Sequence, residues 1–305
     1  MAEDIYPKVT LSNDEVLMLK DSSGNPVELV EYDGYCLARR AIENGEIPDS
    51  RTNIPNIIKM KVRTDDVFLI AYPKAGTHWT SEIIHMLLHG KIEYNTESKI
   101  NSMLPYQTPE RMDQLPSPRI INSHMYFRHL PRDILNKKNK IVFVNRNPKD
   151  VVVSFYYHCQ QVSMKFQGSW NDFFDFFLLD QVHMCHCPWH VYMLDWERFM
   201  LEHTELDVLI VNYEDLSKNS TKEIRRIAEF LDVKNTADFY NKVAERCSFK
   251  QLKQDYVKRD KGGVLFRKGG VGGWKDWFTV SQNERFDKFL KDKMKDSTWK
   301  FIYEL

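Results

Sequence analysis

One stretch of the sequence, residues 67–88, constrains the fold more than any other. It begins with a continuous apolar run from Val67 to Ala71, which is typical of a strand buried on both faces of a parallel sheet. Apolar residues then recur at helical spacing from Trp79 to Leu88. Between the two lies a short loop with Gly76, a residue that permits a tight backbone turn. The stretch therefore predicts a strand, a loop and a helix in succession.

The loop between this strand and helix has the features of an anion site. The backbone amides of residues 75–78 can point at an anion at the helix N-terminus, where the macrodipole favours negative charge. Lys74 adds a mobile full charge. A standard ATP or GTP loop reads G-x-x-x-x-G-K followed by Ser or Thr, whereas here the lysine precedes the only glycine. The loop predicts phosphate binding of another kind; an α/β turn with an incidental lysine is the alternative.

Composition narrows the class of protein. The 305 residues are 42% hydrophobic, so we expect one large α/β domain over residues 1–305. Lysine plus arginine (43) equals aspartate plus glutamate (43), so net charge gives no general attraction to nucleic acid or acidic membranes. The N-terminus lacks a basic segment followed by an apolar one, and no apolar run is long enough to span a bilayer. The five cysteines are irregularly spaced, which favours reduced thiols over a disulfide framework. Together these features predict a cytoplasmic protein.

Further strand and helix patterns follow a polar opening segment that extends to about Pro55. We expect strands or helices at residues 119–124, 140–146, 150–157, 206–215 and 220–231. Strands that alternate with helices predict a three-layer α/β/α fold around a central parallel sheet. In such sheets the ligand lies beyond the carboxyl ends of the strands. The polar residues expected at these ends are Lys74, His124, Arg146 and Tyr213.

Three motifs in a fixed order carry a resemblance to a known family. They are residues 72–79 (Tyr-Pro-Lys-Ala-Gly-Thr-His-Trp), 145–154 (Asn-Arg-Asn-Pro-Lys-Asp-Val-Val-Val-Ser) and 266–275 (Phe-Arg-Lys-Gly-Gly-Val-Gly-Gly-Trp-Lys). A strand-ending Ser-His lies between the first two. The chain resembles, along nearly its whole length, the cytosolic sulfotransferases. These enzymes transfer a sulfuryl group from 3'-phosphoadenosine 5'-phosphosulfate (PAPS) to a small acceptor.

The resemblance implies a metal-free site for PAPS and for its product, adenosine 3',5'-bisphosphate. The first motif would hold the 5'-phosphosulfate in a P-loop-like manner and stack on adenine. The second and third would bind the 3'-phosphate, to which guanidinium groups are suited. Two further segments, at Tyr213 and at residues 247–249, would contact the adenine. The residues implied in donor binding are Lys74, Ala75, Gly76, Thr77, His78, Trp79, Arg146, Ser154, Tyr213, Cys247, Ser248, Phe249, Phe266, Arg267, Lys268 and Gly269.

His124 and Lys74 are the expected catalytic residues. Sulfuryl transfer needs a base for the acceptor's proton, and a histidine near its reference pKa of about 6.5 can supply one at neutral pH. His124 matches the family's catalytic histidine, and Lys74 would stabilise charge on the bridging oxygen of the leaving phosphate. A strand-end histidine on its own is often structural. The alternatives to a sulfotransferase are an inactive PAPS-binding protein and a nucleotide-type kinase.

Three positions depart from the family pattern. Asn122 stands where the family commonly has a lysine, so one cation near the sulfuryl group is missing, which affects the expected rate. His78 replaces a hydroxyl residue and adds a titrating group, so donor affinity is expected to depend on pH. Cys247 replaces a threonine, which weakens a hydroxyl contact.

The resemblance also implies partners. We expect a small phenolic or hydrophobic acceptor, with neither nucleic acid nor membrane as a partner. Residues 275–284 fit the family's dimerisation motif and imply a homodimer, while a helix start capped by Ser281 is the alternative. The motif residues are Lys275, Thr279, Val280 and Glu284.

A histidine- and cysteine-rich segment, residues 183–190, suggests zinc, since the ligand types are present. Its spacing does not follow the usual C-x-x-C pairing. A lid or packing role over the acceptor pocket is the preferred interpretation.

Overall fold

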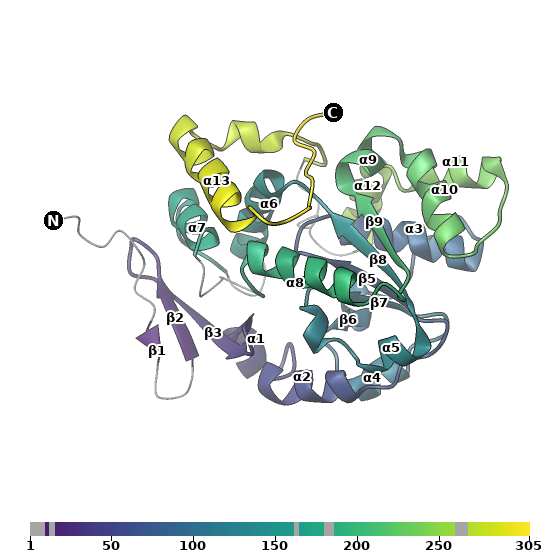
Figure 1. Ribbon diagram of the computed structural model, residues 1–305, viewed down its shortest axis with the longest axis horizontal. Coiled ribbons are helices and arrows are strands. Elements are labelled where there is room, and N and C mark those ends of the chain that lie inside the picture. The colour runs from purple at the N-terminus through teal and green to yellow at the C-terminus, as the bar shows by residue number, and fades with distance from the viewer. Residues whose placement is uncertain (1–9, 12–15, 162–164, 180–185, 260–267) are drawn as a thin grey trace.

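A five-stranded parallel sheet lies at the centre of the computed structural model, which describes residues 10–11, 16–161, 165–179, 186–259 and 268–305 (Figure 1). The strand order is β6-β7-β5-β8-β9, and all four pairings are parallel. The strands are β5 (Val67–Ala71), β6 (Met103–Leu104), β7 (Ile120–Ser123), β8 (Lys140–Asn145) and β9 (Val208–Asn212). The predicted parallel sheet is therefore confirmed.

The central strand β5 shows why its sequence is a continuous apolar run. All five of its residues are buried. Phe68 and Ile70 face one apolar cluster, whereas Val67 and Leu69 face a second cluster on the opposite side. Successive side chains of a strand point to opposite faces, so a strand covered on both sides must be apolar at every position.

Helices cover both faces of this sheet (Figure 1). One face carries α3 (Thr77–His89), α9 (Tyr213–Lys218), α10 (Ser220–Phe230), α11 (Ala237–Arg246) and α12 (Phe249–Arg259). The other carries α6 (Pro148–Gln161), α7 (Trp170–Phe177), α8 (Trp189–Glu202) and α13 (Val280–Lys293). The three-layer prediction is confirmed. No helix within the described residues is both long and apolar enough to cross a membrane.

Shorter elements connect these layers around the edge of the sheet. They are α1 (Arg39–Glu43), α2 (Ser50–Lys59), α4 (Pro109–Asp113), α5 (Asp133–Lys137), and the 3-10 helices η1 (Lys99–Ser102), η2 (Phe127–His129) and η3 (Gly273–Asp276). Of these, η1 matters most for the site because it packs beside β7.

The N-terminal region folds as a second sheet, so the prediction of a polar opening segment is wrong. Its antiparallel strands are β1 (Thr10–Leu11), β2 (Val16–Lys20), β3 (Pro26–Tyr32) and β4 (Tyr35–Ala38). Leu19, Leu29 and Tyr35 are fully buried. The signal that was overlooked is the alternation of apolar and polar residues in β3, followed by a turn at Asp33 and Gly34 with positive φ at both positions.

Two element ends differ from the sequence predictions. The strand expected over residues 206–215 ends at Asn212, because Tyr213 begins α9 and the Asn212 side chain donates to Asp215. Helix α13 is capped by Thr279 rather than Ser281. The Thr279 hydroxyl accepts from the amide of Gln282, whose side chain accepts from the amide of Thr279, which forms a capping box.

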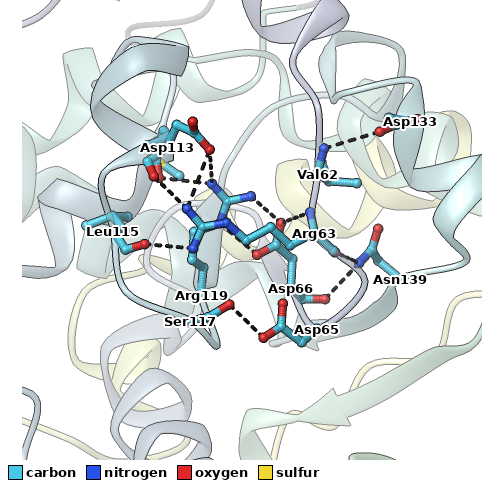
Figure 2. Close-up of polar contacts among 11 residues, drawn as sticks. Val62, Arg63, Asp65, Asp66, Asp113, Leu115, Ser117, Arg119, Asp133 and Asn139 are labelled. Carbon is cyan, nitrogen blue, oxygen red and sulfur yellow. Dashed lines mark hydrogen bonds and ion pairs between the residues drawn. The ribbon is translucent and has the colours of Figure 1, made fainter.

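A buried ion pair links the amino-terminal ends of two strands of the sheet (Figure 2). Arg119 and Asp66 precede β7 and β5, and both side chains are fully buried. Arg119 Nε donates to Asp66 at 2.7 Å, and Arg119 Nη1 donates to the carbonyl of Met112 at 3.0 Å. Asn139, just before β8, donates to the carbonyl of Asp66 at 3.1 Å. This cluster therefore links the starts of three neighbouring strands, at the end of the sheet opposite the predicted site.

Candidate active site

A cavity of about 670 Å³ opens at the carboxyl ends of the central strands. Lys74 comes from the loop after β5, His124 directly follows β7, and Arg146 directly follows β8. Tyr213 follows β9 and also lines the cavity. The sheet thus brings together side chains that are distant in the sequence, at the edge where an open parallel sheet binds its ligand.

Most of the residues expected at the site line this cavity. They are Lys74, Gly76, Thr77, His78, Trp79, His124, Arg146, Ser154, Tyr213, Phe249, Lys268 and Gly269. Three others are not among its lining residues: Ala75, Cys247 and Ser248. Ala75 and Cys247 are buried, and Cys247 Sγ lies 3.7 Å from Met86 Sδ. The remaining two, Phe266 and Arg267, lie outside the described residues.

The loop before α3 is shaped by Gly76. This residue caps the helix with φ of 115°, a left-handed conformation that favours glycine. A Cβ built on Gly76 would lie 2.7 Å from Cδ2 of Tyr213, so no larger residue fits without displacing that ring. The amide of Ala75 donates to the carbonyl of Tyr72 at 3.2 Å and closes the turn. The loop backbone is therefore fixed where it enters the cavity.

Arg146 joins this loop to the C-terminal loop. Its Nη1 donates to the carbonyl of Lys74 at 3.0 Å, and its Nη2 donates to the carbonyl of Gly270 at 3.2 Å. The guanidinium lies 4.0 Å from the centre of the Tyr213 ring. Its Nε is buried without a hydrogen-bond partner. An unsatisfied buried donor in a cation-lined cavity fits an anionic ligand.

The C-terminal side of the cavity is also tightly built. Gly269 has φ of 65°, and a Cβ there would lie 2.0 Å from Cδ2 of Phe249. The rings of Trp79 and Tyr213, which also line the cavity, meet edge to face, with centroids 5.6 Å apart. Glycine backbone and aromatic faces together form a cradle suited to a flat base and its phosphates.

Three lysines line the cavity, Lys74, Lys99 and Lys268, and the sequence analysis did not identify Lys99. Burial and the neighbouring charge of Arg146 lower the pKa of Lys74 to about 8. Lys99, on η1, donates from Nζ to Oγ1 of Thr77 at 2.6 Å. Burial and the charge of Lys74 lower the pKa of Lys99 to about 7. No motif marks Lys99 in the sequence, because only the fold brings η1 against α3.

His124 is held as a neutral imidazole by a hydrogen bond at one of its two ring nitrogens. Its Nδ1 lies 2.6 Å from the carbonyl oxygen of Ala71. Because a carbonyl can only accept, Nδ1 carries the hydrogen, and Nε2 of the neutral ring has the lone pair. Burial, and then the charge of Lys99, lower the pKa of His124 to about 3, well below the reference value assumed from sequence. The ring is therefore neutral at neutral pH, and its Nε2 is unprotonated.

The wall beyond His124 combines apolar side chains with histidines. Its lining residues are Leu37, Ala38, Ala41, Ile47, Met103, Tyr106, His158 and His186. The ring centres of His186 and His124 are 5.4 Å apart. Burial lowers the pKa of His158 well below its ordinary value, so this ring is neutral as well. Leu37 and Ala38 come from β4, Ala41 from α1 and Met103 from β6. The apolar residues of this wall suit an apolar molecule.

The segment that suggested zinc packs against the N-terminal sheet where it is described. Backbone hydrogen bonds join His186 to Cys36 of β4 in both directions. The hydroxyl of Tyr72 donates to the carbonyl of Cys187. His183 and Cys185 lie outside the described residues. Within the residues that the structure describes, no group of three or more histidine, cysteine or acidic side chains could hold a metal ion.

Comparisons with known proteins give matches over most of the chain. A family model described as a sulfotransferase domain matches residues 64–298. Sulfotransferase 1E1 of Bos taurus is 33% identical over 267 residues, covering 81% of this chain and 89% of that protein. Sulfotransferase 1A1 of Rattus norvegicus is 32% identical over 262 residues, covering 79% and 88%. The crystal structure of mouse sulfotransferase SULT7A1 complexed with PAP has a TM-score of 0.71 and 26% identity, covering 88% of this chain and 95% of that one.

Proposed function

The chain belongs to the sulfotransferase family, and from this premise we propose how it works as a PAPS-dependent sulfotransferase. It transfers a sulfuryl group from PAPS to a small acceptor. The observation that carries the mechanism is that Nε2 of His124 is the unprotonated ring nitrogen and can accept a proton. His124 lines the same cavity as the cations Lys74 and Arg146. A base beside an anion-binding wall is the arrangement that this transfer requires.

The donor site that we propose uses three parts of the cavity: the Gly76 loop, the cationic residues beside it and the aromatic rings. The loop around Gly76, with Lys74 and Thr77, binds the 5'-phosphosulfate. Arg146 and Ser154 bind the 3'-phosphate. The buried Nε of Arg146, which has no hydrogen-bond partner, supports this assignment. The adenine lies near Trp79 and Phe249, since flat aromatic faces stack on a base.

The chemical step that we propose is an in-line displacement at sulfur. The acceptor oxygen forms a bond to sulfur while the bond from sulfur to the phosphate oxygen breaks, and that oxygen keeps the electron pair. The proton of the acceptor hydroxyl passes to Nε2 of His124. Lys74 stabilises the charge that develops on the leaving phosphate. The hydrogen bond from Nδ1 to Ala71 supports this role, because it fixes the tautomer that leaves Nε2 able to accept.

The acceptor that we propose is a phenol or another flat, hydrophobic alcohol, with an arylamine as a second class. The wall of Leu37, Ile47, Met103 and Tyr106 supports an apolar body for this molecule. The neutral histidines near His124 support an uncharged reacting group.

The experiment that tests this function is sulfate transfer from radiolabelled PAPS to phenols, steroids, aliphatic alcohols and arylamines, with binding of adenosine 3',5'-bisphosphate measured by calorimetry. We expect tight bisphosphate binding and transfer to at least one phenolic or hydrophobic acceptor. Bisphosphate binding without transfer to any acceptor would instead identify an inactive PAPS-binding protein. Magnesium-dependent ATP turnover would identify a kinase.

Donor binding is expected to take up protons. Anionic phosphates raise the pKa of Lys74, which is about 8 in the free protein, so the bound state holds more protons than the free state. We expect uptake of about half a proton at pH 8, and affinity for the bisphosphate about tenfold weaker at pH 9 than at pH 7. Buried His78, His124 and His158 stay neutral in the free protein over this range. Calorimetry in two buffers of different ionisation enthalpy measures the uptake, and a pH-independent affinity would contradict it.

We also propose that the chain forms one domain, acts in the cytoplasm and pairs as a homodimer through residues 275–284. Val280 is 78% exposed, an unusual position for a large apolar residue, which supports a contact there. The buried thiols Cys187 and Cys247 support a reducing compartment.

Replacing Val280 by glutamate is expected to convert the dimer into a monomer, because the substitution buries a charge in a small apolar contact. Sedimentation velocity measures this change. Leu201→Glu is the matched control, since Leu201 is 71% exposed on α8, and this variant should remain dimeric. A monomeric wild-type protein would count against the proposed dimer.

A further inference from the structure

Lys99 occupies a position that the proposed donor and acceptor must both approach. It lines the cavity together with His124 and Lys74, and its Nζ donates to Oγ1 of Thr77 at 2.6 Å. Thr77 is the first residue of α3 and faces the same space as the phosphosulfate loop. The ammonium of Lys99 is thus held at the start of α3, in the cavity that His124 also lines.

The backbone of Lys99 is itself fixed through Asn122. The Nδ2 of Asn122 donates to Oγ of Ser102 at 2.9 Å. The same Ser102 hydroxyl donates to the carbonyl oxygen of Lys99 at 3.2 Å. Asn122 lies fully buried on β7, two residues before His124. This strand therefore positions the base directly and Lys99 through one intervening hydroxyl.

The charge of Lys99 affects the pKa values of several histidines that line the cavity. Burial is the largest cause of the lowered pKa values of His78, His124 and His158, and the charge of Lys99 lowers them further. Burial and then the charge of Lys74 lower the pKa of Lys99 itself.

Lys74, Lys99 and Arg146 line one cavity, and this arrangement is unfavourable without a ligand, because the desolvated positive charges oppose one another. A polyanionic ligand removes this cost, and Lys99, whose Nζ lies against Thr77 in this cavity, is available to contact one of its anionic groups.

We propose that Lys99 is a catalytic cation that contacts the sulfuryl oxygens during transfer, and that Asn122 positions it through Ser102. The proposal rests on the function given above. Asn122 occupies the position at which a family lysine is expected, so the strand here carries an amide that orders η1, and η1 supplies the ammonium. Lys74 would then act on the leaving phosphate oxygen and Lys99 on the group in transit.

The test compares kinetics and product binding in charge variants. We expect Lys99→Met to lower kcat by about 10²-fold, the usual cost of removing one donor aimed at transition-state charge. Binding of adenosine 3',5'-bisphosphate should weaken by less than about fivefold, because this product has no sulfuryl group. Lys99→Arg should keep most of kcat. Lys91→Met, at an exposed lysine, is the matched control and should be unchanged.

Moving the cation gives a second measurement. In the double variant Lys99→Met/Asn122→Lys, a lysine on β7 supplies the ammonium in place of Lys99. We expect its kcat to be at least about tenfold higher than that of Lys99→Met. A kcat of Lys99→Met within about twofold of wild type would overturn the proposal, as would a loss of bisphosphate binding equal to the loss of kcat. If the wild type transfers sulfate and these variants fail to respond, only the role of Lys99 is lost. No transfer by the wild type itself would reject the proposed function.

Discussion

Replacing His124 by alanine is expected to lower kcat by about 10² to 10⁴-fold, the range for loss of a general base. The reason is geometric as well as chemical. The bond from Nδ1 to the carbonyl of Ala71 leaves Nε2 as an acceptor, and the pKa lowered to about 3 keeps it unprotonated at neutral pH. Steady-state sulfate transfer at saturating PAPS and acceptor measures the loss.

Product binding separates this loss from a damaged donor site. His124→Ala should bind adenosine 3',5'-bisphosphate with nearly wild-type affinity, because the proposed phosphate contacts come from the Gly76 loop and Arg146. His89→Ala, on the exposed end of α3, is the matched control and should keep full activity. Retention of more than about a tenth of kcat in His124→Ala would remove His124 from the role of base.

The part of the fold that could be predicted is the part encoded by local pattern. The strand β5 was predicted with its observed bounds, since a strand buried on both faces has an unbroken apolar sequence. Helix α3 and the loop at Gly76 followed, because the glycine and the helical spacing lie next to that strand. The alternation in β3 was equally local, and it was missed because the segment was read as polar.

The rest of the site depends on contacts between distant segments, which a single sequence does not show. Lys99 contacts Thr77 although the two residues are 22 positions apart in the chain, and no residue pattern predicts that contact. The pKa of His124 departs from its reference value because burial and the charge of Lys99 act together. Asn122 could be identified as a departure from the family pattern, but its hydrogen bond to Ser102 could not.

Breaking the buried pair of Asp66 and Arg119 is expected to lower the free energy of unfolding by about 3–5 kcal/mol. Both side chains are fully buried, so Asp66→Ala leaves the guanidinium of Arg119 desolvated without its carboxylate. Urea unfolding followed by circular dichroism measures the change. Lys242→Ala, which removes an exposed helical ion pair with Asp238, is the control and should leave the urea midpoint unchanged.

A double variant shows whether the pair or the lone charge is responsible. Asp66→Leu/Arg119→Met replaces both charges by apolar side chains, and it should be more stable than Asp66→Ala, because no unpaired buried charge remains. Equal losses in both variants would contradict this account. The pair lies at the amino-terminal ends of β5 and β7, whereas the cavity lies at their carboxyl ends. The variants that remain folded should therefore keep the wild-type kcat, since stability and catalysis depend on opposite ends of the same strands.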